Sequence, residues 1–174
     1  MIINFKQDQS RRSVLFENLA KLLIRKEKNN NFIFITRNFN FFNEIVLKYK
    51  LNIKELNPKI IELFEKRITS VDLIEFKLKD KYSRIVNEII LYEVKTKISN
   101  NKYRYDICLS SFETYHKAQV LNIETKLISF VLFENWRYSF NIHDLDLSKY
   151  NVYSKALKNR YEAKIKANLI LKNN

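Results

Sequence analysis

The chain has 174 residues, none of which is glycine, and a single proline, Pro58. Glycine adopts left-handed backbone conformations without strain and lets a backbone approach a phosphate closely. Walker-type phosphate loops, dinucleotide-binding fingerprints, EF-hand loops and the G-x-S-x-G nucleophile turn all require glycine at fixed positions, so the sequence excludes them. Asparagine is the expected substitute in left-handed turns, and its clusters at 29–31, 38–40 and 100–101 predict turns there.

Cysteine and histidine limit the chemistry further. One cysteine and two histidines exclude a zinc finger, any His/Cys metal cage within one chain and a disulfide framework. We therefore expect an intracellular, reducing, cytoplasmic location. No run approaches the roughly 18 apolar residues that span a bilayer, so no membrane span is expected.

The charge is strongly positive: 32 Lys and Arg face 19 Asp and Glu, which gives a formal net charge of +13. Such a balance favours polyanionic partners, nucleic acid first and an anionic membrane second. The same richness in lysine, asparagine and isoleucine is also typical of an A/T-rich genome. The alternative is that the positive charge reflects only this composition and that the lysines are simply solvated on the surface.

Apolar periodicity and turn signals predict the elements. Helices are predicted over 10–25, 41–50, 58–67, 110–121 and 153–171, with Ser110 or Ser111 capping the fourth. Strands are predicted over 31–36, 71–78, 85–96, 125–133 and 136–142, and residues 103–109 are predicted to be extended. This order predicts an α/β fold with a mixed central sheet flanked by helices.

Two parts are expected: an α/β domain over 1–147, with a helical insertion at about 38–67, and a basic C-terminal helix within 148–174. The last helix carries many lysines and an apolar stripe, which consists of Ala156, Tyr161, Ile165, Leu169 and Ile170. That stripe could dock on the domain, form a dimer or lie on a membrane.

The informative motif is Tyr92-Glu93-Val94-Lys95-Thr96 on a predicted strand. Side chains alternate along a strand, so Glu93 and Lys95 share one face while Val94 packs on the other. If the preceding strand forms a hairpin with this one, Asp72 lies beside Glu93. Two carboxylates in one site suit Mg²⁺, which takes few protein carboxylates and keeps several waters.

Such a site can hydrolyse a phosphodiester. The metal would polarise the substrate and lower the pKa of a bound water. Lys95 would orient or deprotonate that water, or stabilise charge on the phosphorus, and Glu17 on the first helix could add an acidic group. The alternative for a Glu-x-Lys pair on one strand is an ordinary exposed ion pair, which contributes little.

The order of these elements and motifs, over roughly residues 10–142, resembles the PD-(D/E)XK nuclease superfamily, in particular its restriction-endonuclease-like and Holliday-junction-resolvase-like members. The resemblance implies an endonuclease that uses Mg²⁺, or Mn²⁺ as a substitute, and acts on DNA. It also implies that Asp72 and Glu93 bind the metal, that Lys95 is the catalytic lysine and that Glu17 is the helix glutamate of some members. Val71 stands where the family has proline, and the 72–93 spacing is long.

Several side chains are predicted to contact the nucleic acid. Lys97 and Lys102 flank the site, and the helix that follows supplies the rest: Ser111, Tyr115 and Lys117. Dimerisation would suit a protein that cuts two strands. A metal-free triad of His116 with a tyrosine and a lysine, as in tRNA-splicing ribonucleases, is a further alternative.

Two other function classes remain open at this stage. One is a catalytically inactive nuclease-like protein that binds nucleic acid or serves in assembly. The other is an interaction protein whose basic charge reflects only genome composition. Metal affinity and the salt dependence of binding distinguish these classes.

Overall fold

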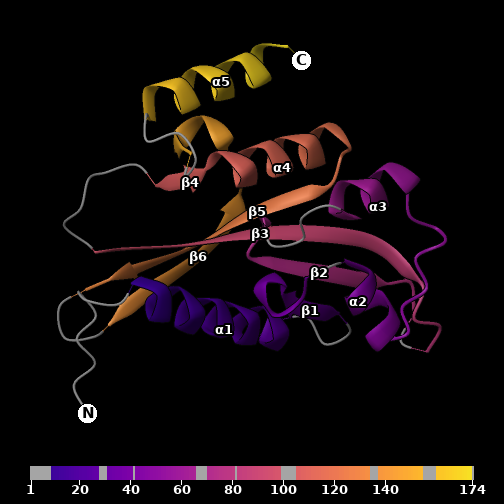
Figure 1. Cartoon of the computed structure of the whole chain (residues 1–174). Coiled ribbons are helices and arrows are strands. Elements are labelled where there is room, and N and C mark those ends of the chain that lie inside the picture. The colour runs from indigo at the N-terminus through magenta and orange to yellow at the C-terminus, as the bar shows by residue number, and fades with distance from the viewer. Residues whose placement is uncertain are drawn as a thin grey trace.

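Figure 1 shows the computed structural model of the chain. The structure describes residues 9–27, 31–40, 42–65, 70–80, 82–98, 105–133, 137–154 and 160–173. No helix in these ranges is long and apolar enough to cross a membrane.

A mixed five-stranded sheet forms the centre of the fold, in the order β1-β2-β3-β5-β6. β3 and β5 are parallel, and the other neighbouring pairs are antiparallel. The strands are β1 (Phe32–Ile35), β2 (Leu73–Leu78), β3 (Val86–Ile98), β5 (Glu124–Leu132) and β6 (Tyr138–Asp144). Helices flank this sheet, which confirms the predicted α/β class with a mixed sheet.

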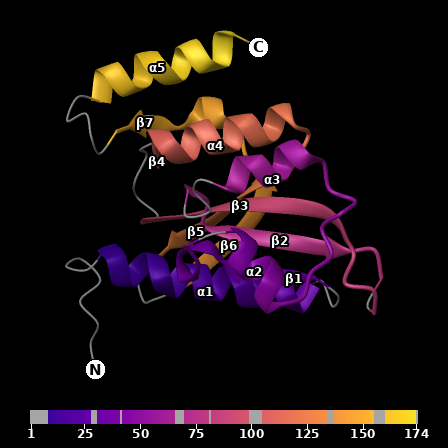
Figure 2. The same cartoon turned by 45° about the vertical axis from the view of Figure 1, so that its right-hand side comes forward.

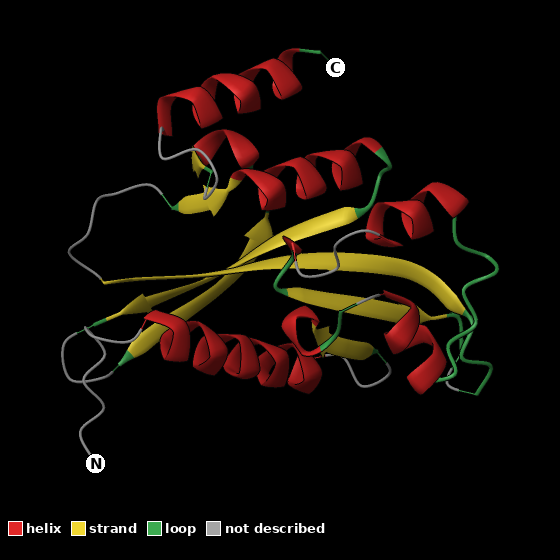
Figure 3. Ribbon diagram, in the orientation of Figure 1, coloured by secondary structure: helices red, strands yellow, loops and turns green. Residues whose placement is uncertain are grey.

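The helices cover the two faces of the sheet (Figures 1 and 3). α1 (Gln9–Glu27) lies on one face, and α4 (Leu109–Val120) lies on the other. The predicted insertion at 38–67 contains two helices, α2 (Phe42–Lys48) and α3 (Pro58–Glu65). The 3-10 turn η1 (Thr36–Asn38) leads into it from β1. The Asn57 side chain accepts the amide of Lys59 at 3.0 Å, so α3 begins with a capped turn and Pro58 in its first position.

A second, smaller sheet lies on the α4 side of the molecule (Figure 2). It consists of β4 (Asp106–Cys108) paired in parallel with β7 (Asn151–Tyr153), which follows the 3-10 turn η4 (Leu147–Lys149). The last helix, α5 (Arg160–Lys172), packs against β7 and α4. The predicted helix over 153–171 is therefore wrong at its start, because Tyr153 belongs to a strand. A three-residue strand shows no periodicity that sequence reasoning can detect.

Two apolar cores lie on either side of the main sheet. α1 contributes Phe16, Ala20 and Ile24 to one core, which it shares with strand residues such as Tyr92 and Phe130. α2, α3, α4 and the C-terminal segment share the other core. β3 alternates between them: Tyr92 packs on the α1 side and Leu91 on the α4 side. Glu93 and Lys95 are two and four residues after Leu91, so their side chains lie on the same face of the sheet, the α4 face.

Three helix predictions need correction. The helix over 10–25 is predicted from an apolar spacing that includes Val14 and Leu22, but these two are exposed on α1, and the buried face runs through Phe16 and Ala20. On α5, Ala163 and Ala167 are buried and Ile170 packs against the core, while Tyr161, Ile165 and Leu169 are exposed, so these three do not dock on the domain. Ala156 lies outside the described residues. In α4 neither serine is the cap, because the helix already begins at Leu109, directly after β4.

Left-handed backbone occurs despite the absence of glycine. Among the described residues, Lys50, Arg84 and Asn122 have φ values of 51°, 52° and 57°. Asn122 fits the expected role of asparagine after a helix. The described asparagines of the predicted clusters, Asn31, Asn38 and Asn40, do not have positive φ, and Lys50 and Arg84 take such conformations instead.

Candidate functional site

Asp72 lies directly before β2 and opposite Glu93 of β3. Leu73 pairs with Tyr92 in the antiparallel register, which places the preceding residue, Asp72, across from Glu93. The Asp72 amide donates to the Tyr92 carbonyl at 3.2 Å, and its carbonyl accepts the amide of Thr36 at 3.1 Å. Backbone contacts to two neighbouring segments thus fix the position of this carboxylate.

The Asp72 carboxylate also accepts a hydrogen bond, from the Val94 amide to Oδ2 at 2.8 Å. Burial raises the pKa of Asp72 well above its ordinary value, and repulsion by Glu93 and Glu17 adds to the rise. Attraction by Lys95 and the Val94 amide opposes it. The two carboxylates therefore lie close enough to repel each other, as the predicted hairpin requires.

Glu93 and Lys95 form an ion pair with Nζ and Oε1 2.5 Å apart. The Glu93 residue is 3% exposed, so this is not the ordinary surface pair that the sequence left as an alternative. Burial acts to lower the pKa of Lys95, but attraction by Glu93 and Asp72 outweighs it and the net pKa is raised. Lys95 is therefore a cation here, suited to stabilising negative charge rather than to removing a proton.

Glu17 reaches the same group from α1. It is 2% exposed, and it forms an ion pair with Arg37, which follows β1. Its second oxygen, Oε2, is buried and has no hydrogen-bond partner among the described residues. Burial is the largest cause that raises the pKa of Glu17 to about 7, against the attraction of Arg37, and Glu93 adds to the rise.

A further carboxylate of β2, Glu75, is three residues from Asp72 and lies on the other face of the sheet, because side chains alternate along a strand. It is fully buried, and it accepts hydrogen bonds from the Tyr92 hydroxyl and the Asn31 side chain. The structure therefore brings Glu17, Asp72, Glu93 and Lys95 together and keeps Glu75 apart.

The predicted nucleic-acid contacts are more scattered. Tyr115 is fully buried, and its hydroxyl donates to the Tyr92 carbonyl at 2.8 Å, so it has no surface for the predicted contact. Ser111 is partly buried in the first turn of α4, and Lys117 is exposed on that helix. Lys97 lies beside the site with Nζ 5.8 Å from the centre of the Tyr105 ring. Lys102 lies outside the described residues.

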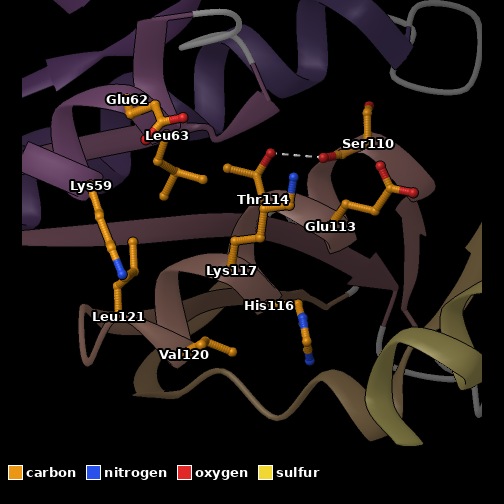
Figure 4. Close-up of a pocket in the computed structure, with 10 residues that line it drawn as sticks. All are labelled: Lys59, Glu62, Leu63, Ser110, Glu113, Thr114, His116, Lys117, Val120 and Leu121. Carbon is orange, nitrogen blue, oxygen red and sulfur yellow. Dashed lines mark hydrogen bonds between the residues drawn. The ribbon is translucent and has the colours of Figure 1, made fainter. Parts of the chain in front are cut away.

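A surface pocket of about 610 Å³ separates α3 from α4 (Figure 4). Lys59 and Glu62 face Glu113 and Lys117 across it, and the Thr114 hydroxyl donates to the Ser110 carbonyl at 2.8 Å. His116 also lines it, and burial lowers the pKa of this imidazole. None of the four clustered site residues lines this pocket, and its charges are balanced.

The carboxylate cluster suits a small divalent cation. Glu17, Asp72 and Glu93 are three acids against two cations, Arg37 and Lys95, and the buried Oε2 of Glu17 lacks a partner among the described residues. No group of three or more His, Cys, Asp or Glu side chains in the described part of the chain is arranged to hold a metal. Mg²⁺ needs only one or two protein carboxylates, so Asp72 and Glu93 fit its requirement.

Sequence reasoning missed two residues of this region, Arg37 and Tyr150. Arg37 is the ion-pair partner of Glu17 and follows a strand, where a cation carries no distinctive signal. Tyr150 is buried between η4 and β7 in a segment predicted as the approach to a helix. Burial raises the pKa of its hydroxyl, and Glu93, Tyr105 and Asp72 contribute further.

Comparison with known proteins gives no family for the chain. No protein-family model matches the sequence, and no curated protein sequence matches it.

Proposed function

We propose that the chain is a metal-dependent nuclease of the PD-(D/E)XK type that hydrolyses phosphodiester bonds, with DNA as the favoured substrate. The observation that carries the proposal is the register that sets Asp72 opposite Glu93, with Lys95 on the same face. The order α1-β1-β2-β3-α4-β5 around these residues supports it, because it is the order on which the resemblance rests.

The residues divide the chemistry among them. Asp72 and Glu93 would hold Mg²⁺ or Mn²⁺, and the ion would polarise the phosphodiester and lower the pKa of a water. The Lys95 ammonium would oppose the negative charge that builds on the phosphate oxygens. Glu17, with a pKa of about 7, is half ionised at neutral pH and suited to accept a proton at Oε2.

With these groups, each bond and each proton of the hydrolysis is accounted for. The oxygen of the attacking water bonds to phosphorus as the bond from phosphorus to the leaving oxygen breaks. The proton of that water passes to Glu17 Oε2, and the leaving oxygen takes a proton from solvent. Arg37, which pairs with the other oxygen of Glu17, holds this carboxyl group in place.

The chain contains a matched control for the lysine. Glu124 and Lys126 on β5 have the same Glu-x-Lys spacing and form an ion pair at 2.7 Å. The two lysine side chains are about equally exposed, but the Glu124 side chain is 42% exposed and that of Glu93 only 5%. Supercoiled plasmid incubated with the full chain and Mg²⁺ should be nicked by the parent and by Lys126→Ala at similar rates. Lys95→Ala should be slower by a factor of about 100 or more. Cleavage by Lys95→Ala at the parent rate would overturn the proposal.

The second candidate is a binding protein with the same site and no catalysis. The Glu93–Lys95 ion pair favours it, since each group already neutralises the other. Calorimetric titration with Mn²⁺ separates the candidates. Affinity that is lost in Asp72→Asn and Glu93→Gln supports the nuclease, whereas DNA binding without such affinity supports the binding protein.

A further inference from the structure

The hydroxyl of Tyr150 is a buried donor without a partner. The residue is 6% exposed, and its oxygen has no hydrogen-bond partner among the described residues. Buried polar groups are nearly always hydrogen-bonded, because an unsatisfied one loses the solvation that it had in water. An unsatisfied buried hydroxyl beside a carboxylate cluster therefore requires an explanation.

The backbone around Tyr150 is held from both sides. Its amide donates to the Leu147 carbonyl at 3.3 Å, and the next amide, that of Asn151, donates to the Tyr105 carbonyl at 2.9 Å. Its ring lies 6.2 Å from the ring of Tyr105, centre to centre. These contacts, together with the pairing of β4 with β7, hold the backbone and the ring of Tyr150 in place.

The phenol lies on the site side of the sheet. The β4–β7 pair lies above the C-terminal half of β3 on the α4 face, the face to which Glu93 and Lys95 belong (Figures 1 and 2). After burial, repulsion by Glu93 is the next largest cause that raises the pKa of Tyr150, and Asp72 also contributes. The hydroxyl therefore lies within electrostatic range of both carboxylates, and the raised pKa keeps it protonated.

Tyr115 provides the contrast. It is also buried near the same carboxylates, but its hydroxyl is committed to the Tyr92 carbonyl at 2.8 Å. The Tyr115 hydroxyl is therefore hydrogen-bonded within the protein, whereas the Tyr150 hydroxyl is available as a donor.

We propose that Tyr150 is a substrate-contacting residue whose hydroxyl donates a hydrogen bond to a non-bridging oxygen of the phosphate bound at Asp72 and Glu93. The assignment rests on the proposed nuclease function. A buried neutral donor near two carboxylates that would hold a metal is satisfied by a ligand that brings anionic oxygen to that metal. The bond strengthens as charge builds on that oxygen during hydrolysis, so it acts more on kcat than on KM.

Tyr150→Phe in the full chain tests this contact, because it removes one oxygen and keeps the ring. The readout is steady-state cleavage of a labelled DNA oligonucleotide in Mg²⁺, with the thermal unfolding midpoint measured beside it. We expect kcat to fall by a factor of about 10 to 100, KM to change little, and the midpoint to stay equal or rise. Tyr82→Phe, at a 90% exposed turn position, is the matched control and should behave as the parent.

The outcomes separate the two proposals. If Tyr150→Phe keeps the parent kcat, the phosphate contact is wrong and the nuclease proposal stands. The contact is also wrong if the variant loses activity only because its unfolding midpoint is lower. If the parent and Asp72→Asn are equally inactive in Mg²⁺ and Mn²⁺, the nuclease proposal fails, and the phosphate contact fails with it.

Discussion

The Val94 amide donates a hydrogen bond to the Asp72 carboxylate at 2.8 Å, across the two strands that carry the candidate site. Val94 stands between Glu93, which repels the Asp72 carboxylate, and Lys95, which attracts it. The backbone of β3 therefore orients the same carboxylate on which these two side chains act. The contact explains how acids from two strands remain close without a covalent link.

Asp72→Asn should abolish cleavage without destabilising the protein. The raised pKa means that the folded state disfavours the ionised carboxylate, and this cost grows as the pH rises through the folded pKa. Asparagine keeps an oxygen for the Val94 amide and carries no charge. We expect a free energy of unfolding at pH 7 equal to or above that of the parent, from urea titration, with cleavage reduced by a factor of about 100 or more.

The contrasting variant is Asp72→Ala, which removes the acceptor. It leaves the Val94 amide unsatisfied, at a cost of about 1–3 kcal/mol. An asparagine variant as unstable as the alanine variant would show that Asp72 is a structural anchor rather than a strained site residue.

Glu17 should make stability depend on pH in the acidic range. Its pKa is raised from 4.5 to about 7 on folding, so the folded state prefers the protonated form. That preference stabilises the fold fully below about pH 4.5 and is lost as the pH rises through about 7. At about 1.4 kcal/mol per pKa unit, the loss amounts to a few kcal/mol at most.

The measurement is the free energy of unfolding of the parent and Glu17→Gln at pH 5 and pH 8. The parent should lose more stability than the variant between these values. Glu62→Gln, which alters an exposed glutamate of α3, should follow the parent. Identical pH profiles for the parent and Glu17→Gln would contradict the raised pKa.

Tyr115→Phe should destabilise the fold. The variant loses a buried hydrogen bond to the Tyr92 carbonyl, which keeps the Asp72 amide as its other donor, and the loss costs about 1 kcal/mol. Urea unfolding measures the change, with Tyr82→Phe as the exposed control. An unchanged midpoint for Tyr115→Phe would show that the hydrogen bond contributes nothing net.

DNA binding should weaken steeply with salt and should depend on where lysines lie, not on their number. Each neutralised phosphate contributes a slope of about −0.9 in log affinity against log salt. Lys164 and Lys172 are exposed on α5, and Lys54 and Lys59 are exposed near α3. Changing the first pair to glutamine should lower the slope by about 2 if α5 contacts DNA. Fluorescence anisotropy checks this, and equal effects from both pairs would point to net charge alone.

Much of the central architecture could be predicted because its segments are periodic. The β2–β3 hairpin follows from alternation, and it sets the registration of Asp72 with Glu93. The neighbourhood of Glu17 depends on which face of α1 is buried, and the sequence allows two faces: Val14 and Leu22 are as apolar as Phe16 and Ile24. Only the packing against β1 and β3 decides between them.

The parts that escaped prediction depend on long-range contacts. β7 exists because β4, more than forty residues earlier in the chain, offers it a partner. On α5, Ala163 and Ala167 face the domain because small side chains let the helix approach closely, whereas the larger Tyr161, Ile165 and Leu169 face solvent. The apolar pattern of the sequence identifies the larger side chains as a stripe, but it does not decide which residues of the helix meet the domain.

The turn before β3 has a consequence for the order of folding. Arg84 has left-handed backbone, and its side chain donates to the Tyr49 carbonyl and lies 5.9 Å from the Phe32 ring centre. Its carbonyl accepts the amide of Asn52. A glycine turn would form by itself, but this one is held by β1 and by the segment after α2. The hairpin that positions Asp72 opposite Glu93 should therefore close only after those distant segments have assembled, and the site should be among the last parts of the chain to form.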